Sequence, residues 1–212
     1  DEVNAIADQK FTKGTKMLNE AAVARAVAAL IPEDAIIVID GGQVMEWGHT
    51  FMHPRDPQSF VFGPGMGHLG MGLPFANAAK AAQRDRPVVL FTGDGAMGCT
   101  FQELETAARY GLNIIVIVCN DSYWGMYRPF GEDLFNNKEL GVRLTKINFA
   151  AAAEAMRRIL VEHARRKNSL KRGSGAGHDE LNESAIVLTA PPDELLAVHE
   201  ALDGLAAVDP DA

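Results

Sequence analysis

The order of apolar and polar segments along the first part of the chain predicts an α/β fold. Short, wholly apolar runs are typical of parallel strands that are covered on both faces. Here a wholly apolar run at 35–39 and three mainly apolar runs are interspersed with segments of helical periodicity. The predicted strands are 35–39, 59–62, 87–92 and 113–119, and the predicted helices are 20–31, 73–83 and 101–110. This order predicts a doubly wound, mainly parallel sheet with helices on both faces.

Three of the predicted strands are followed directly by polar or glycine-rich turns, at 41–43, 93–97 and 120–124. In parallel sheets, ligands bind beyond the carboxyl ends of the strands. The second turn carries Asp94 between two glycines, and the third begins with Asn120 and Asp121, 26 and 27 residues later. We therefore expect oxygen ligands from two neighbouring strand ends to lie close together.

Such a pair of turns suits a divalent cation with a bound diphosphate. A hard cation prefers several oxygen ligands, and the amides of Gly95, Ala96 and Met97, just after Asp94, can donate to phosphate oxygens. The structural alternative is a tight turn in which Asp94 only caps a helix. The second polar turn, at 120–124, favours the metal–diphosphate interpretation.

A nicotinamide-binding fold is the competing interpretation. Residues 65–70, GMGHLG, have the form G-x-G-x-x-G, and Asp94 follows Gly70 by 24 residues, close to the dinucleotide fingerprint. However, the predicted strand before this segment is short, and its glycines continue to Gly72. A NAD-binding Rossmann domain is therefore the second choice.

Composition narrows the function classes. At 212 residues, the chain suits one domain or one domain with an appendage. A net charge of −8 argues against a general nucleic-acid binder. No apolar run approaches the ~20 residues of a membrane span. Cys99 and Cys119 lie in apolar or glycine-rich segments, which predicts buried thiols in a reducing, cytoplasmic compartment.

Gly93-Asp94-Gly95 followed by Asn120-Asp121 resembles the thiamine-diphosphate signature, which runs from Gly-Asp-Gly to an Asn or Asn-Asn pair. The segments GPGMGHLGMGLP at 63–74 and FQELETAARYGLNIIVIVCND at 101–121 resemble acetolactate synthase, 2-hydroxyacyl-CoA lyase and related 2-oxo acid decarboxylases. The similarity covers roughly 15–149, most of the diphosphate-binding, C-terminal domain of these enzymes. It implies a thiamine-diphosphate-binding fold.

The resemblance implies roles for individual residues. Asp94 and Asp121 would bind Mg²⁺ together with the main-chain carbonyl of Tyr123. Because the family usually has Asn where this chain has Asp121, Asn120 is a possible substitute ligand. The residues implied around thiamine diphosphate are Gly42, Gln43, Gly67, His68, Leu69, Gly93, Gly95, Ala96 and Met97. Among these, Leu69 would hold the cofactor bent, the Gly67 carbonyl would accept a hydrogen bond from it, and His68 would have a positioning role.

The family's chemistry is the cleavage or formation of a C–C bond, with a small 2-oxo acid or an acyl-CoA as substrate. Its activating glutamate lies in a separate pyrimidine-binding domain, which nothing in this chain matches. The resemblance therefore implies half of an active site, with no catalytic residue assigned in this chain. We expect the missing half to come from a pyrimidine-binding domain or subunit in a homo- or hetero-oligomer. Residues 124 and 126–128 would begin the substrate-side segment.

The last part of the chain differs in composition and in resemblance. Residues 157–172 hold seven of the 20 Lys and Arg residues, and GSGAG at 173–177 is linker-like. Residues 150–212 resemble part of an extracytoplasmic-function-type sigma factor. We therefore predict a chimera: a domain at 1–149 that is incomplete at its C-terminal end, and a helical tail at 150–212. DNA binding by the tail is an alternative function, but the basic run is better explained as a solvated helix face.

Overall fold

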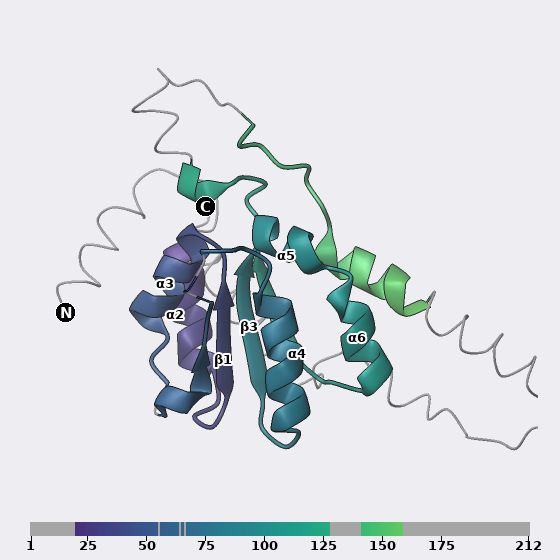
Figure 1. Ribbon diagram of the computed structural model, residues 1–212. Helices are drawn as coiled ribbons and strands as arrows, with labels where there is room; N and C mark the ends of the chain where they lie inside the picture. Colours follow the sequence, from purple (N-terminus) through teal and green to yellow (C-terminus); the bar gives the residue numbers. More distant parts are fainter. Residues whose placement is uncertain (1–19, 55, 64, 66, 128–140, 159–212) are drawn as a thin grey trace, which may run out of the picture.

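The computed structural model describes residues 20–54, 56–63, 65, 67–127 and 141–158. Within them, four parallel strands form one sheet in the order β2-β1-β3-β4. The strands are β1 (Ile36–Asp40), β2 (Phe60–Val61), β3 (Val88–Gly93) and β4 (Ile115–Cys119). β1 and β3 lie at the centre (Figure 1), and all their residues are buried. The predicted parallel sheet is thus confirmed.

Helices cover both faces of this sheet. α2 (Glu20–Leu30) and α3 (Gln43–Phe51) pack on one face, against Ile37, Ile39 and Phe91. α4 (Gly72–Ala82), α5 (Asp94–Thr100) and α6 (Glu103–Tyr110) contribute to the cluster on the other face, with Val38 and Leu90. Figure 1 shows α2 and α3 on one side of the strands and α4 and α6 on the other. The doubly wound arrangement is therefore confirmed.

The strand order reverses between β1 and β3. From β1 the chain passes through α3 to β2 on one side, and then returns through α4 to β3 on the other side of β1. In doubly wound sheets this reversal opens a crevice at the carboxyl ends of the two central strands. The crevice therefore lies between the segments that follow Asp40 and Gly93, where the sequence predicts two of its polar turns.

Two helices were not expected from the sequence. α3 begins at Gln43, inside the predicted turn 41–43. α5 begins at Asp94, so that all of the predicted turn 93–97 except Gly93 is helical. Both helices contain glycine, which lowers intrinsic helix propensity. Tertiary packing explains α3, because Gly48 lies so close to Ile39 that an added Cβ would be 3.0 Å from the Ile39 Cγ2.

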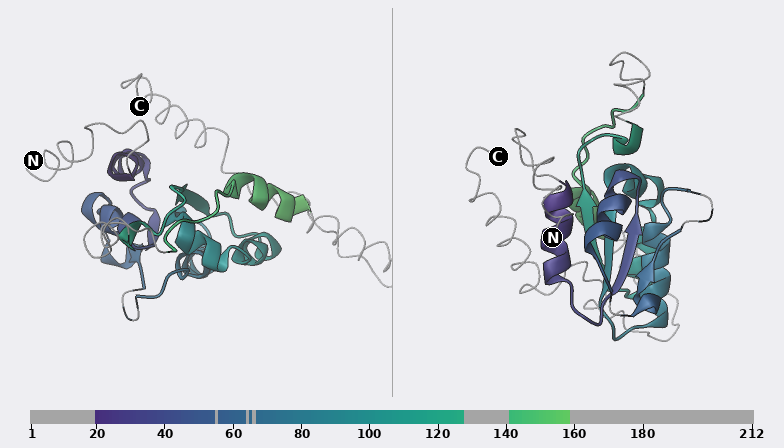
Figure 2. Two further views of the ribbon diagram at one scale, coloured as in Figure 1. Left: turned by 90° about the horizontal axis from the view of Figure 1, so that it is seen from above. Right: turned by 90° about the vertical axis from the view of Figure 1, so that its left-hand side faces the viewer.

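Residues 149–158 are helical, as the predicted helical tail requires at its start. Phe149, Ala153 and Met156 pack against the α4–α6 face of the core, and the helix lies beside α6 in both Figure 1 and Figure 2. Glu154 pairs with Arg157 and Arg158 within the helix. The rest of the predicted tail and its linker at 173–177 lie outside the described residues. No helix in the described ranges is long and apolar enough to cross a membrane.

Candidate cofactor and metal site

A pocket opens at the carboxyl ends of β1, β3 and β4, at the crevice between the two central strands. It holds about 430 Å³ of space, part of which is open solvent. Nine of the thirteen predicted site residues line it: Gly42, Gln43, Leu69, Gly93, Asp94, Gly95, Ala96, Asp121 and Tyr123. The polar turns after β1, β3 and β4 thus contribute residues to one pocket.

Asp94 is the buried acid of this pocket, with 6% of its surface exposed. Its Oδ1 accepts a hydrogen bond from its neighbour's amide, Gly95 N, at 2.9 Å, and its Oδ2 accepts one from Ser122 N at 2.9 Å. Burial is the main cause that raises the pKa of Asp94, and the negative charge of Asp121 raises it further, while the amide hydrogen bonds lower it. Asp94 thus links the end of β3 to the segment after β4.

Asp121 is half-buried, and its Oδ1 accepts a hydrogen bond from Tyr123 N at 2.9 Å. The two carboxylates repel each other, and a hard cation such as Mg²⁺ bound between them would remove this repulsion. Carboxylate oxygens are also the ligands that such a cation prefers. The described residues contain no group of three His, Cys, Asp or Glu side chains that could hold a metal ion. Further ligands would have to come from main-chain carbonyls, from a bound diphosphate or from water.

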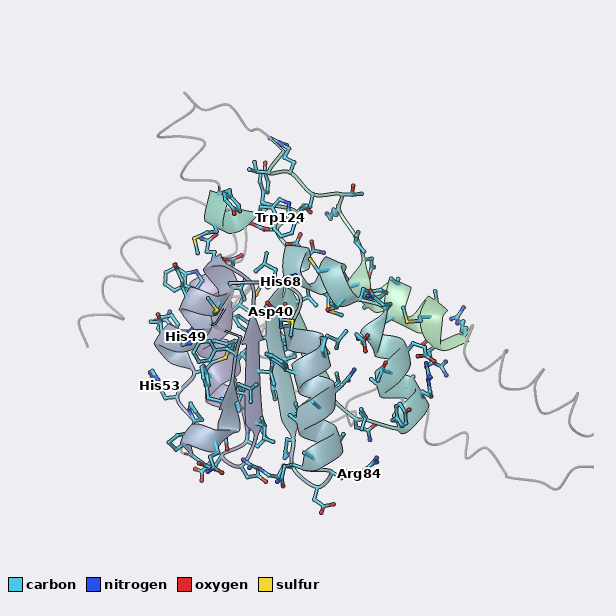
Figure 3. All side chains as sticks on the ribbon, viewed as in Figure 1. Asp40, His49, His53, His68, Arg84 and Trp124 are labelled. Atoms are coloured by element: carbon cyan, nitrogen blue, oxygen red, sulfur yellow. The ribbon has the colours of Figure 1, made fainter. Side chains whose placement is uncertain are left out.

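Four predicted site residues do not line the pocket. Asn120 is exposed, and its Nδ2 donates to the Ile147 carbonyl at 2.7 Å, so its amide serves the segment before the 149–158 helix. The Met97 side chain is 3% exposed and belongs to the core. Gly67 and His68 are exposed, and the His68 Nδ1 contacts the Leu69 carbonyl. Figure 3 shows His68 at the carboxyl end of the sheet, whereas His49 and His53 lie away from it.

Residues 122–127, which we call the closing segment, pack over the glycines of the pocket. A Cβ added to Gly42 would lie 2.9 Å from the Met126 Cβ, and a Cβ added to Gly95 would lie 2.6 Å from the Trp124 Cζ3. Trp124 N donates to the Val142 carbonyl at 2.8 Å, which fixes the closing segment to the chain beyond it. The resemblance implied that both glycines surround thiamine diphosphate. In this structure they also accommodate the closing segment.

The structure adds residues that the sequence did not single out for the site. Glu20, Val44, Cys119 and Gly125 also line the pocket, along with Trp124, Met126 and Tyr127 of the expected substrate-side segment. Arg128 lies outside the described residues. Nothing in the sequence pattern linked Glu20, the first residue of α2, to this pocket. Asp40, a lone acid at the end of an apolar strand, lies next to the pocket-lining turn after β1 without lining the pocket itself, and the sequence analysis did not single it out.

The strand order argues against the nicotinamide alternative. The segment GMGHLG does lie between β2 and α4, but the strand that follows α4 is β3, which is separated from β2 by β1. Asp94, at the end of β3, is therefore two strands away from the start of this segment. In the dinucleotide-binding unit, the acid that binds the ribose ends the next parallel strand of the same βαβ unit.

Comparisons with known proteins give two family matches. Residues 40–177 match the family described as thiamine pyrophosphate enzyme, C-terminal TPP binding domain, and residues 143–212 match the family described as ECF sigma factor. The two matches overlap at 143–177, so they do not by themselves set a boundary between the two parts.

Individual relatives are also thiamine enzymes. The chain is 38% identical to 2-hydroxyacyl-CoA lyase 2 of Caenorhabditis elegans, over 55% of this chain and 18% of the relative. It is 36% identical to the acetolactate synthase large subunit of Lactococcus lactis, over 58% and 21%. It is 26% identical to sulfoacetaldehyde acetyltransferase of Alcaligenes xylosoxydans xylosoxydans, over 77% and 27%.

A solved structure supports the same assignment. The thiamine diphosphate-dependent 4-hydroxybenzoylformate decarboxylase of Rhodococcus jostii RHA1 superposes with a TM-score of 0.61 at 30% identity, over 68% of this chain and 27% of that one. The chain thus spans about a quarter or less of these relatives' lengths. Because the family match covers more than half of the chain, the chain belongs to the thiamine pyrophosphate enzymes and carries their C-terminal TPP-binding domain.

Proposed function

We propose that this domain binds thiamine diphosphate through Mg²⁺ and supplies half of the active site of an enzyme that cleaves or forms C–C bonds. The observation that carries the proposal is the pair Asp94 and Asp121, which line one pocket from the ends of the neighbouring strands β3 and β4. Carboxylates in this position suit a cation that also holds a diphosphate.

In this proposal, Asp94 and Asp121 bind Mg²⁺ through their carboxylates, and Tyr123 adds its main-chain carbonyl. Asp121 is preferred over Asn120 because Asn120 is exposed and bonded to Ile147. Gly42, Gln43, Gly93, Gly95 and Ala96 surround the diphosphate. The half-buried Leu69 supports the thiamine part from the pocket wall, with Gly67 and His68 beside it in the sequence.

Bound thiamine diphosphate supplies the electron-accepting centre that allows a C–C bond next to a carbonyl carbon to break or form. The chain's own residues bind and orient it, and the closing segment restricts the access of water to the pocket. The substrate is a small 2-oxo acid or an acyl-CoA, by analogy with the relatives. A proton relay to the pyrimidine ring comes from a pyrimidine-binding domain or subunit, so the chain acts within a homo- or hetero-oligomer.

Turnover assays test whether the chain needs a separate pyrimidine-binding domain for activity. With thiamine diphosphate and Mg²⁺ added, the chain alone should neither decarboxylate pyruvate-like 2-oxo acids nor cleave 2-hydroxyacyl-CoA, because a missing acid–base group typically costs ~10²–10⁴-fold in rate. A parallel calorimetric titration should show binding of thiamine diphosphate and none of NAD. Robust turnover by the chain alone would contradict the incomplete site, and NAD binding would contradict the cofactor.

The match of residues 143–212 to ECF sigma factors raises DNA binding by the tail as an alternative function. We propose that the chain is a chimera of a thiamine-diphosphate/Mg-binding domain at 1–149 and a sigma-like part at 150–212, and that the tail does not bind DNA specifically. Binding of the full chain to duplex DNA should therefore be absent or vanish as salt increases. Sequence preference that survives moderate salt would contradict this.

A further inference from the structure

A buried carboxylate outside the metal pair holds two segments of the site together. Asp40, the last residue of β1, is 6% exposed. Its Oδ1 accepts a hydrogen bond from Gly41 N at 2.8 Å, and its Oδ2 accepts one from Gly72 N at 2.7 Å. Gly72 is 32 residues away along the chain and begins α4. One side chain therefore joins the turn after β1 to the end of the glycine-rich segment.

The contact with Gly72 depends on the absence of a side chain there. A Cβ at this position would lie 2.6 Å from the Asp40 Cβ and 2.7 Å from the Leu90 Cδ1. Contacts this short require something to shift, so only glycine lets the backbone come this close to the carboxylate. The same segment is held a second time, because Thr100 Oγ1 of α5 donates to the Gly70 carbonyl at 2.7 Å.

Leu69, which directly precedes Gly70 in the sequence, lines the wall of the pocket. Asp40 itself does not line the pocket, so it acts on a ligand only through the segment that it holds. Figure 3 shows Asp40 at the same end of the sheet as His68 and Trp124, opposite to Arg84. The position of Leu69 is therefore fixed from β1 through Asp40 and from α5 through Thr100.

Burying the charged carboxylate of Asp40 costs free energy, which its hydrogen bonds must offset. Burial is the main cause that raises the pKa of Asp40, opposed by the amide hydrogen bonds and by the charge of His68. A carboxylate offers two acceptor oxygens, whereas an amide of the same shape offers one acceptor and two donors. Asp40 can thus accept from Gly41 and Gly72 at once, which no isosteric neutral side chain can do.

We propose that Asp40 is a positioning residue that fixes segment 67–72 against the end of β1 and thereby sets the affinity of the pocket for thiamine diphosphate. This inference rests on the proposed function for its ligand, but the anchoring contact belongs to this chain alone. A residue that acts only on stability would change the unfolding temperature without changing the affinity of the folded protein or the exchange of one particular segment.

The test compares Asp40→Asn with the wild-type chain well below the unfolding temperature. An asparagine of the same shape would turn an NH₂ group toward one of the two amides and leave it unpaired. We expect thiamine diphosphate with Mg²⁺ to bind at least about 10-fold more weakly. Hydrogen exchange, followed by mass spectrometry, should become faster in peptides covering 67–72 and stay unchanged in β3.

Ser59→Ala is the matched control. Ser59 is also buried, at 2% exposure, and its hydroxyl is bonded to Asp56 and Arg86 before β2, at the other end of the sheet. This variant should lose thermal stability while keeping both the affinity and the exchange rates of 67–72. An equal loss of affinity in Ser59→Ala, or normal affinity and exchange in Asp40→Asn, would overturn the role of Asp40.

A measurement on the unmodified chain covers the case in which Asp40→Asn does not fold. In a pH titration followed by NMR, the amide resonances of Gly41 and Gly72 should shift together with one midpoint, because both donate to the same carboxylate. Independent behaviour of the two amides would overturn the inference. If the wild-type chain binds no thiamine diphosphate at all, the proposed function fails together with the affinity role, whereas normal binding by Asp40→Asn overturns only the latter.

Discussion

The indole ring of Trp124 lies against the backbone of Gly95, so closely that a Cβ at position 95 would be 2.6 Å from the Trp124 Cζ3. This contact places an aromatic ring of the closing segment directly beside the residue that follows the central acid of the site. The turn that contains Gly95 and the closing segment are therefore packed against each other, so that a change in one should displace the other.

Gly95→Ala should displace Trp124. The added methyl group has no room beside the ring, so the ring must move toward solvent, and tryptophan emission should shift to longer wavelength. Gly98→Ala is the matched control, since an added Cβ there meets no atom within 4 Å. Gly98→Ala, in the same helix, should raise the free energy of unfolding by up to about 1 kcal/mol and leave the tryptophan emission spectrum unchanged. Identical spectra for both variants would contradict the contact.

Ser122 adopts a left-handed backbone conformation, with φ of 63°, while its amide donates to Asp94. Ser122→Gly should change the free energy of unfolding by less than about 1 kcal/mol, because glycine removes the steric strain but has more freedom in the unfolded chain. Ser122→Val should lower it by about 1–2 kcal/mol. Urea unfolding measures both. Equal stability of the two variants would mean that residue 122 is not held in this conformation.

The sequence predicted the central strands well, because short apolar runs such as 35–39 and 87–92 are typical of strands that are covered on both faces. It also predicted that Asp94 and Asp121 would share a site, since parallel strands bring their carboxyl ends together. It missed α5, because the order of glycines in GDGAMGCT is typical of a turn, and the packing of Met97 into the core decides the outcome.

Contacts between distant segments were harder to predict. The bond from Asn120 to Ile147 turns that side chain away from the pocket, and the one from Gly72 to Asp40 joins residues 32 positions apart. No pattern of neighbouring residues predicts either of these hydrogen bonds, because each depends on how distant loops pack against each other. Both cysteines were expected to be buried, but Cys99 of α5 is exposed and Cys119 is only half-buried.

The two thiols should differ in reactivity. Cys119 lines the pocket, and burial, followed by the charges of Glu20, Asp121 and Asp94, raises its pKa, so the reactive thiolate is disfavoured. A thiol reagent at neutral pH should therefore modify Cys99 at least about 10-fold faster than Cys119. Cys99→Ser should remove the fast phase alone. Two equally fast phases in the folded wild-type chain would contradict the environment assigned to Cys119.

The pH dependence of the unfolding free energy should reveal the raised pKa of Asp40. Because burial raises its pKa above the ordinary value of 3.8, the folded chain binds this proton more tightly than the unfolded chain. Its contribution to stability therefore falls as the pH rises from about 3.8 through the raised pKa. Asp94 has a shift of the same sign, so Asp40→Asn should reduce this decline without abolishing it. An unchanged slope of unfolding free energy against pH would contradict the raised pKa.

The central claim is that Asp94 and Asp121 bind thiamine diphosphate through a metal ion, and isothermal titration calorimetry tests it most directly. Thiamine diphosphate should bind saturably in Mg²⁺ and not in EDTA. Asp94→Asn and Asp121→Ala should each weaken binding by at least about 10-fold, whereas Asn120→Ala should retain most of it. Equal affinity with and without Mg²⁺, or undiminished affinity in Asp94→Asn, would contradict the account.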